Sequence, residues 1–473
     1  MATAGSSPLQ RLPLHLVAGI LVHLGSFQHL GCAILSHRVF LLAFKDNVRS
    51  ITSGIITAQI PPEILPFAIA LLESTCIDPR NHDAAETLLM NLNTSIINPS
   101  NAVPHLLRAS VSQIVFMSKS YEAVESLRHG LVEELIPVLN EKMGLSHSRQ
   151  ISQQERFRLD RAFFRFQLMC SLFSRGKGAI HPTERHTELF FHSFSPWVNE
   201  QLICVYAYLE RKVCDAFDDV AGHDVDFGEM PVYWQEDPED SPHIQEFLCQ
   251  GLPYLSTICS TKNYDVRASL ITLERFCAMN WDKHPTNVLF NAALLAEMEE
   301  DDLEVDDAPL LEDYELAELA RPLDGEQDSI DSGPCSIWFN THLENALFSS
   351  IYNRGIDKHL WEFGYVLWDY NDPNRTEIVS RGDAARTWPY FPEHLEVWTK
   401  EEMDRSMDER AAIYGANGKG YWPRGRYDFS GIRGLTEETK QRLIDGWRQR
   451  DESKNRLKRK AAADDKEDEQ NRV

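Results

Sequence analysis

Apolar residues recur at helical spacing from the start of the chain. In LPLHLVAGILVHL, residues 12–24, the apolar positions 16, 17, 20, 21 and 24 fall on one continuous stripe. Pro13 suits the first turn of a helix, where a missing N–H costs nothing, and Gly25 is typical of a helix end. The opposite side of this helix carries only small or weakly polar residues, so we expect it to be covered on more than one side.

The same pattern predicts two further short helices. Ser26 is a favourable N-cap, and FQHLGCAILSHRVFLLAFKDN, residues 27–47, presents two apolar faces with a break at Ser36. Three short helices in about 35 residues bury too little apolar surface to be stable alone. This segment therefore needs either the rest of the chain or a partner.

Helical periodicity continues beyond residue 50. The sequence SQQE at 152–155 is a capping box in front of an aromatic-rich helix, and clean alternation of apolar and polar residues is scarce. Only short runs such as GYVLWD, residues 364–369, are candidates for strands. No repeat of 20 to 50 residues stands out. We predict a mainly α fold: an N-terminal three-helix unit, an irregular multi-helical body and a smaller C-terminal α unit, the last with or without short strands.

Chain length and the distribution of charge along the sequence indicate how the chain is organised into domains and linkers. A chain of 473 residues usually forms two or three domains. We expect a helical unit at 1–50, a helical body at 51–296, an acidic linker or insertion at 297–333, an aromatic-rich C-terminal unit at 334–450 and a disordered charged tail at 451–473. The acidic segment reads as a solvated linker, with binding of a basic partner as the alternative.

The charge balance excludes some classes of partner. A net charge of −25 argues against nucleic-acid binding through the body of the protein, because phosphate recognition depends on Lys and Arg. The chain turns basic only near its end, in KNRLKRK. This cluster is a candidate nuclear localisation signal, with a solvated basic tail as the alternative. Its basic residues are Lys454, Arg456, Lys458, Arg459 and Lys460.

Cysteine usage and hydropathy point to an intracellular protein. The chain has nine cysteines and no C-x-x-C pair, so neither a disulfide framework nor a zinc site is expected. The N-terminal apolar run has little positive charge before it and no clear cleavage site, and no stretch is long and apolar enough for a membrane span. We expect the cytoplasm, the nucleus or both, and no membrane partner.

Candidate catalytic chemistry is sparse. The three histidines of HPTERHTELFFH, residues 181–192, are five and six positions apart, so they do not share a helix face as a metalloprotease pair would. G-x-S-x-G, Walker and G-x-G-x-x-G motifs are absent. The Gly-rich segment 414–434 lacks the strand–loop–helix context of a nucleotide site. We therefore predict no catalytic residues, no metal and no cofactor, and that the protein is not an enzyme.

The N-terminal unit resembles a known motif in the order of its residues. That order is Leu12-Pro13, Leu16, Ile20-Leu21, Leu24, a short gap, Leu30, then Ile34-Leu35-Ser36 and Phe40. It is similar to the three-helix F-box, and more narrowly to the F-box-like proteins of filamentous fungi, which place S-F before the second helix and often continue with A-F-K. This chain has SF at 26–27 and AFK at 43–45. His15 and His29 stand where the family commonly has acidic residues.

This resemblance implies a function. F-box proteins are non-catalytic substrate adaptors, in which the F-box docks on the cullin-linked adaptor subunit of a ubiquitin ligase and the remainder captures a protein target for degradation. By position, eight residues would divide between docking and the core of the unit: Leu12, Pro13, Leu16, Ile20, Leu24, Leu30, Ile34 and Phe40. Two alternatives stay open. The chain could be a helical interaction or scaffold protein without ligase docking, or these residues could only begin the core of one large helical domain.

Overall fold

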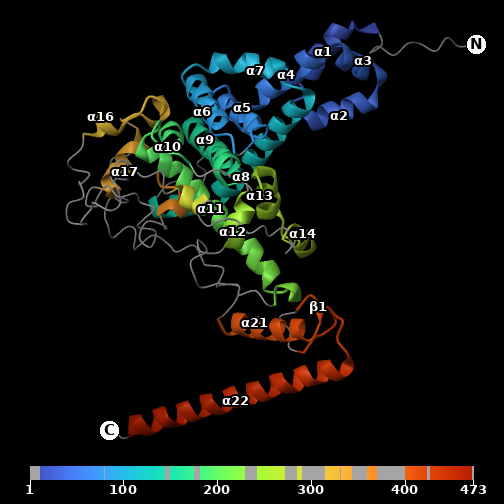
Figure 1. Ribbon diagram of the computed structural model, residues 1–473, viewed down its shortest axis with the longest axis vertical. Helices are drawn as coiled ribbons and strands as arrows, with labels where there is room; N and C mark the ends of the chain where they lie inside the picture. The colour runs from blue at the N-terminus through green and yellow to red at the C-terminus, as the bar shows by residue number, and fades with distance from the viewer. Residues whose placement is uncertain are drawn as a thin grey trace, which may run out of the picture. The chain divides into compact units, whose positions relative to one another are not determined.

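A computed structural model describes residues 11–78, 80–143, 150–174, 182–228, 242–271, 285–289, 315–330, 332–342, 360–369, 400–422 and 427–470. The fold is mainly α-helical, as the periodicity predicts (Figure 1). In these residues the strands are one short antiparallel pair, β1 (Lys419–Gly420) and β2 (Ile432–Arg433). The suggestion of a strand at residues 364–369 is wrong, because residues 364–367 form turns that follow a short helical segment.

The chain forms two compact units. Unit 1 contains residues 1–213, 239–261 and 277–391, and unit 2 contains residues 214–238, 262–276 and 392–473. The N-terminal helices therefore belong to the same unit as most of the helical body, and the boundaries expected from composition stay predictions. No helix in the described ranges is long and apolar enough to cross a membrane.

Unit 1 opens with the three short helices that the sequence predicts, and a fourth follows at once. These are α1 (Leu14–Val22), α2 (Phe27–Ser36), α3 (Arg38–Asp46) and α4 (Val48–Gln59). The carbonyl of Pro13 accepts hydrogen bonds from two N–H groups of the first turn of α1, and Ser26 Oγ accepts the N–H of His29 at 3.2 Å. The helix start at Pro13, the cap at Ser26 and the break at Ser36 are confirmed.

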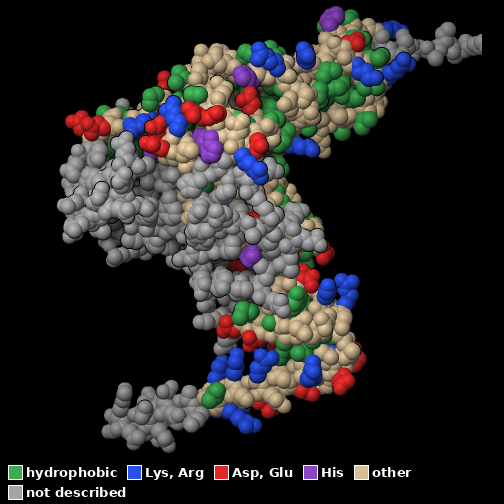
Figure 2. Space-filling view, in the orientation of Figure 1, with side chains coloured by type: hydrophobic (Ala, Val, Ile, Leu, Met, Phe, Trp, Pro, Cys, Tyr) green, Lys and Arg blue, Asp and Glu red, His purple; other side chains and the backbone are tan. Residues whose placement is uncertain are grey.

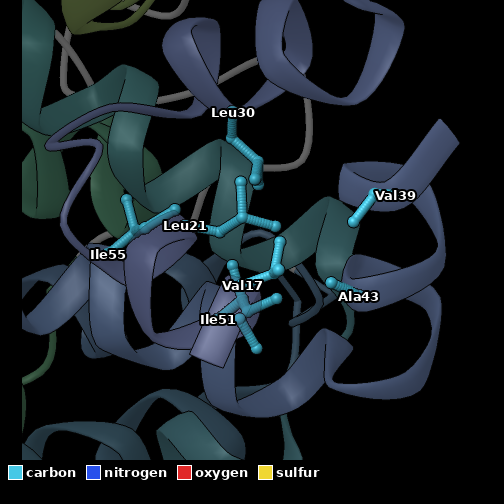
Figure 3. Close-up of a cluster of buried hydrophobic side chains, with 8 residues drawn as sticks. Val17, Leu21, Leu30, Val39, Ala43, Ile51 and Ile55 are labelled. Atoms are coloured by element: carbon cyan, nitrogen blue, oxygen red, sulfur yellow. The ribbon is translucent and has the colours of Figure 1, made fainter. Parts of the chain in front are cut away.

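One apolar cluster joins these four helices. Val17 and Leu21 of α1 are fully buried and lie among side chains of α2, α3 and α4 (Figure 3). Ile51 and Ile55 of α4, which are also fully buried, complete this cluster. The three-helix segment thus obtains its missing core from the next helix of its own chain, which explains how so small a unit can be stable.

The body of unit 1 is built on longer helices. Its elements before residue 213 are α5 (Leu65–Ser74), α6 (His82–Ile97), η2 (Pro99–Ala102), α7 (Val103–Arg108), α8 (Val111–Met143), α9 (Gln153–Met169), η3 (Cys170–Ser174), α10 (Glu184–Phe190) and the greater part of α11 (Pro196–Ala221). Later elements are α12 (Pro242–Leu248), α13 (Leu252–Ser260), α15 (Pro285–Leu289), α16 (Leu316–Leu319), η11 (Glu326–Asp328) and α17 (Gly333–His342). Helix α8 packs on α4, α5, α9 and α13.

Helix α9 places charged side chains inside the body. The capping box at its start is confirmed, because Ser152 Oγ accepts the N–H of Glu155 and the Glu155 carboxylate accepts the N–H of Ser152. Farther along, Arg158, Arg161 and Arg165 are each about 1% exposed. Guanidinium groups at such burial need acidic or carbonyl partners, and for Arg158 and Arg161 a segment far along the chain supplies several of them.

The partners come from the segment expected to be a solvated linker. The Asp328 carboxylate accepts hydrogen bonds from Arg158 Nε at 3.2 Å and Arg161 Nη2 at 2.7 Å. Asp324 accepts the N–H of Ser195 at 2.8 Å. Both aspartates are buried. The expectation of a solvated acidic segment is wrong at these two residues, because Asp328 forms buried ion pairs with Arg158 and Arg161 and the Asp324 carboxylate accepts backbone N–H groups.

Unit 2 has its own small core. Its elements are the end of α11, η4 (Val225–Phe227), α14 (Tyr264–Leu270), α21 (Lys400–Gly415), the β1–β2 pair and α22 (Glu437–Gln470). Trp422 and Trp447 lie in an apolar cluster with Val225, Ile413 and Ile432. The indole N–H of Trp422 donates to Glu409 at 3.0 Å. These two tryptophans therefore pack in a core, which was the default interpretation of the aromatic-rich region.

The C-terminal tail differs from the sequence expectation. Residues 451–473 were expected to be disordered, but α22 continues through them to Gln470. Helical spacing of opposite charges, such as Glu452 four residues before Arg456, and the alanines at 461–463 favour this continuation.

Candidate protein interface

The structure divides the eight predicted docking residues into two groups. Leu30 is buried, and Leu24, Ile34 and Phe40 pack partly buried against the N-terminal cluster. The other four residues are exposed: Leu12, Pro13, Leu16 and Ile20. The first group holds the unit together, and the second leaves a surface available to a partner.

The exposed side of α1 carries an apolar row. Leu12, Leu16 and Ile20 follow one another at intervals of four residues and are 38%, 51% and 49% exposed. We call these three residues the docking face. The adjacent residues of the same helix, Val17 and Leu21, are fully buried. Apolar side chains gather over the N-terminal helices at the end of unit 1 (Figure 2).

A second row runs beside this docking face. His15 and Gly19 of α1 are four residues apart, His23 follows directly after the helix and Arg11 precedes it, and all four are exposed. Side chains four residues apart on a helix form a continuous ridge, so the apolar ridge of α1 lies next to a polar one. The second ridge has a gap at Gly19, where an added Cβ would meet no atom within 4 Å.

The N-terminal helices differ in charge from the rest of the chain. Residues 11–59 contain Arg11, Arg38, Lys45 and Arg49 against a single acid, Asp46, whereas the chain as a whole has a net charge of −25. The N-terminal helices as a whole therefore combine exposed apolar side chains with a small net positive charge, unlike the rest of the chain.

Unit 1 exposes another apolar stripe, which the sequence reading missed. Val103 and Leu107 of α7 and Val111, the first residue of α8, are spaced four positions apart and are 44%, 52% and 40% exposed. We call them the α7 stripe. Leu106, on the other side of α7, is buried. The sequence does show apolar residues at every fourth position here. Periodicity alone, however, does not tell which of two apolar rows on a helix faces the core.

A small pocket lies next to α7. Helices α5 and α6, together with η2 and α7, line it with Pro66, Ile69, Ala70, Glu73, Leu88, Asn91, Leu92, Ser95, Ala102 and His105. Glu73 Oε1 and His105 Nδ1 are 2.8 Å apart at this pocket, where both side chains are partly exposed. The lining is mixed, with apolar walls and a few polar groups, which suits capture of a side chain from a protein partner better than chemistry on a small molecule.

The histidine segment has a structural role in the described residues. His186 is the N3 residue of the capping box of α10, with Nδ1 3.2 Å from the backbone N of Thr183, and its ring stacks on His82 at 5.6 Å between centroids. Burial lowers the pKa of His186, and the hydrogen bond to the His82 carbonyl opposes that shift. His181 lies outside the described residues, and within them no group of three or more His, Cys, Asp or Glu could hold a metal.

Two of the buried ionisable groups of unit 1 show how the fold supplies partners for charge in its core. Burial raises the pKa of Asp160, while Arg128, which hydrogen-bonds to it, lowers it. Complete burial lowers the pKa of Arg165 well below its usual range; this side chain donates to Asn199 Oδ1 at 2.8 Å and stacks over the ring of Phe194 at 4.0 Å. Such pairs orient helices within a core, and we assign them to stability rather than to catalysis.

The candidate nuclear localisation cluster lies on α22. Lys454, Arg456, Lys458 and Arg459 are exposed, and the side chain of Lys460 lies outside the described part. Leu457, within this cluster, is 68% exposed. The helix therefore presents its basic side chains to solvent, and their role as a signal stays a prediction.

Comparisons with protein-family models, with curated proteins and with solved structures find no match to this chain. Its interpretation therefore depends on its own residues and geometry.

Proposed function

We propose that this chain is an F-box-like substrate-recognition adaptor, which joins the cullin-linked adaptor subunit of a ubiquitin ligase to a protein target. The docking face of α1 is the observation that carries the proposal. Leu16 and Ile20 remain about half exposed although Val17 and Leu21 on the same helix are fully buried. A row of large apolar side chains left outside a complete core is typical of a surface that another protein covers.

The core of the N-terminal unit removes one competing explanation for this row. If all eight residues only began the core of a large domain, Leu16 and Ile20 would pack on the body as Leu30 does. Instead Leu16 and Ile20 stay outside the apolar cluster, which Ile51 and Ile55 of α4 complete. The docking face thus lies outside the core of the N-terminal unit, which supports docking as its use.

An adaptor also needs a surface for its target. The α7 stripe is a second exposed apolar row in unit 1, and His105, on another side of α7, lines the pocket together with Glu73. We assign target capture to this surface. The adaptor itself performs no bond chemistry in this proposal: it contributes proximity, which raises the effective concentration of the target near the ligase.

A binding assay with the purified cullin-linked adaptor subunit tests the docking face. Ile20→Asp should weaken binding of the full chain by roughly 30-fold or more, because a central apolar contact is commonly worth about 2 kcal/mol and an unpaired charge replaces it. Ile20 is half exposed, so the fold should survive the change. Leu457→Asp, at another exposed apolar residue in α22, is the matched control and should bind as the wild type does.

Two outcomes would contradict this proposal. Wild-type chain that does not bind the cullin-linked adaptor subunit would favour the alternative function, a helical interaction or scaffold protein without ligase docking. The family commonly has acidic residues where this chain has His15 and His29, and this difference is the observation on which that alternative depends. Binding that Ile20→Asp leaves unchanged would place the contact on another surface.

A further inference from the structure

The pocket beside α7 has an apolar floor and a polar rim. Its four polar residues, Glu73, Asn91, Ser95 and His105, are at least partly exposed, so they lie where the pocket meets solvent. The space that the pocket encloses is about 290 Å³ including its open mouth, which matches a single side chain better than a cofactor. The floor consists of six buried apolar residues: Pro66, Ile69, Ala70, Leu88, Leu92 and Ala102.

The rim of this pocket contains one carboxylate with an oxygen to spare. Glu73 Oε1 lies 2.8 Å from His105 Nδ1, and within the described ranges Glu73 Oε2 has no hydrogen bond or ion pair. None of the described residues that line the pocket is a Lys or an Arg. Glu73 also lies in the last turn of α5, where the helix carries a partial negative charge. A cation would therefore be stabilised at Glu73 Oε2, whereas an anion would be repelled by it.

Two uncharged side chains of the rim add further acceptors. The side chains of Asn91 and Ser95 form no hydrogen bond with any other residue that the structure describes. Amide and hydroxyl oxygens accept from N–H donors, and an ammonium or guanidinium group offers three or five such donors and no acceptor. The available oxygens of Glu73, Asn91 and Ser95 thus match a basic group more fully than they match a carboxylate.

We propose that this pocket binds a basic side chain, lysine or arginine, of the captured target, with its aliphatic stem on the apolar floor and its charged end at Glu73. This inference rests on the proposed function and deepens it, because it states which chemistry the target presents. The net charge of −25 on the chain also favours the approach of a basic partner.

The dimensions of the floor suit such a side chain. Pro66 and Glu73 are seven positions apart on α5, which places them about 10 Å apart along the helix axis. The methylene groups of a lysine or arginine can therefore lie along the floor while the charged end reaches Glu73. Both side chains commonly cover apolar surface with their stems and keep the charged end at an edge that water reaches.

A titration with a lysine derivative tests the pocket. The probe is N-acetyl-lysine N-methylamide, added to the full chain at pH 8 while NMR follows the methyl groups of Ile69, Ala70 and Ala102. These methyl groups should shift with a Kd on the order of millimolar, as expected for so small a ligand. The norleucine counterpart has a similar length and no charge, and it should bind at least roughly fivefold more weakly because it forms no charge-assisted hydrogen bond. The arginine counterpart should bind as the lysine derivative does, and the glutamate counterpart should not shift these methyl groups.

Glu73→Gln removes the charge of the rim and keeps the shape of the side chain. This variant should bind the lysine derivative only as weakly as the wild type binds the norleucine derivative. Its urea midpoint should stay close to that of the wild type, because the Glu73–His105 pair is partly exposed. Glu63→Gln is the matched control: Glu63 is exposed, precedes α5 and does not line the pocket, so this substitution should leave the affinity unchanged.

The outcomes separate failure of this inference from failure of the proposed function. A norleucine derivative that binds as tightly as the lysine derivative would overturn the site for a basic side chain, and so would a lysine derivative that leaves the methyl groups unshifted. Ile20→Asp should not change the affinity for the lysine derivative, because the docking face and the pocket lie on different helices. A wild-type chain that binds the lysine derivative but not the cullin-linked adaptor subunit would overturn the adaptor proposal, and with it the assignment of the ligand to a captured target, while the chemistry of the pocket would stand.

Discussion

Replacing Asp328 with alanine should destabilise unit 1 by about 3 kcal/mol, a value near the lower limit for the loss of one partner of a buried ion pair. The Asp328 carboxylate accepts hydrogen bonds from Arg158 at 3.2 Å, from Arg161 at 2.7 Å and from Gln201 Nε2 at 2.7 Å. Asp328 is fully buried, and Arg158 and Arg161 are each about 1% exposed. The substitution thus removes one negative charge from between two positive ones, where water does not replace it.

The partners that remain keep the expected loss near that lower limit. Arg158 retains Asp369 at 2.6 Å, and Arg161 retains Gln201 Oε1 at 2.6 Å and the carbonyl of Asp324 at 3.1 Å. One of the two guanidinium groups would therefore still face a carboxylate. Asp328→Asn should cost less than the alanine variant, about 1–3 kcal/mol, because its amide oxygen can still accept a hydrogen bond.

Urea unfolding followed by circular dichroism measures this change, and hydrogen exchange locates it. Amides of α9 should exchange faster in Asp328→Ala, while those of α21 in unit 2 should not change. Asp445→Ala is the control, since Asp445 is about half exposed and lies 3.8 Å from Arg448; it should shift stability by less than about 1 kcal/mol. If Asp328→Ala unfolds at the same urea concentration as this control, the buried network does not stabilise the body as we argue.

The remaining predictions concern pH and localisation. Burial is the largest effect on Asp324 and raises its pKa, although the N–H of Ser195 opposes the shift. The folded state therefore holds the proton of Asp324 more tightly than the unfolded state. The stability of the wild type relative to Asp324→Asn should fall as pH rises from about 4 through the raised pKa, and should then stay constant. Urea midpoints of both proteins over this pH range measure the difference, and midpoints that change equally with pH in the two proteins would contradict the prediction. Replacing Lys458 and Arg459 with Gln should abolish nuclear accumulation of the tagged full chain, whereas Lys440→Gln on the same helix should not. Fluorescence imaging of the tagged chain in cells measures this accumulation. A wild-type chain that never enters nuclei would show that the basic cluster is not a localisation signal.

Local features of the N-terminal helices could be predicted from the sequence because short-range chemistry determines them. Pro13 lacks an N–H and fits a helix start, and the Ser26 hydroxyl satisfies an N–H of the first turn of α2. The capping box at Ser152 and Glu155 has the same origin. Each of these features depends on residues within about four positions of one another, which a single sequence displays directly.

The division of α1 into a buried and an exposed row could not be predicted in the same way. Leu16 and Val17 are adjacent, equally apolar residues on the same broad stripe, yet Val17 is fully buried and Leu16 is half exposed. Their difference is decided by Ile51 and Ile55, which are more than 30 positions away in the chain. Likewise, the arginines of α9 look like surface residues until Asp324 and Asp328 are brought to them by the tertiary fold.

Helix α4 connects the two surfaces that the proposed adaptor requires. It packs on α1, whose other side carries the docking face, and also on α7, whose other side carries the α7 stripe. Both surfaces therefore belong to elements that contact the same helix, and α4 in turn packs on α8. Proximity raises the rate of a transfer only when the linked partners are held in a productive geometry, since a loose connection dilutes the effective concentration. A target bound at the α7 stripe would thus be held at a fixed distance from a subunit docked on α1, and the single helix between them sets that distance.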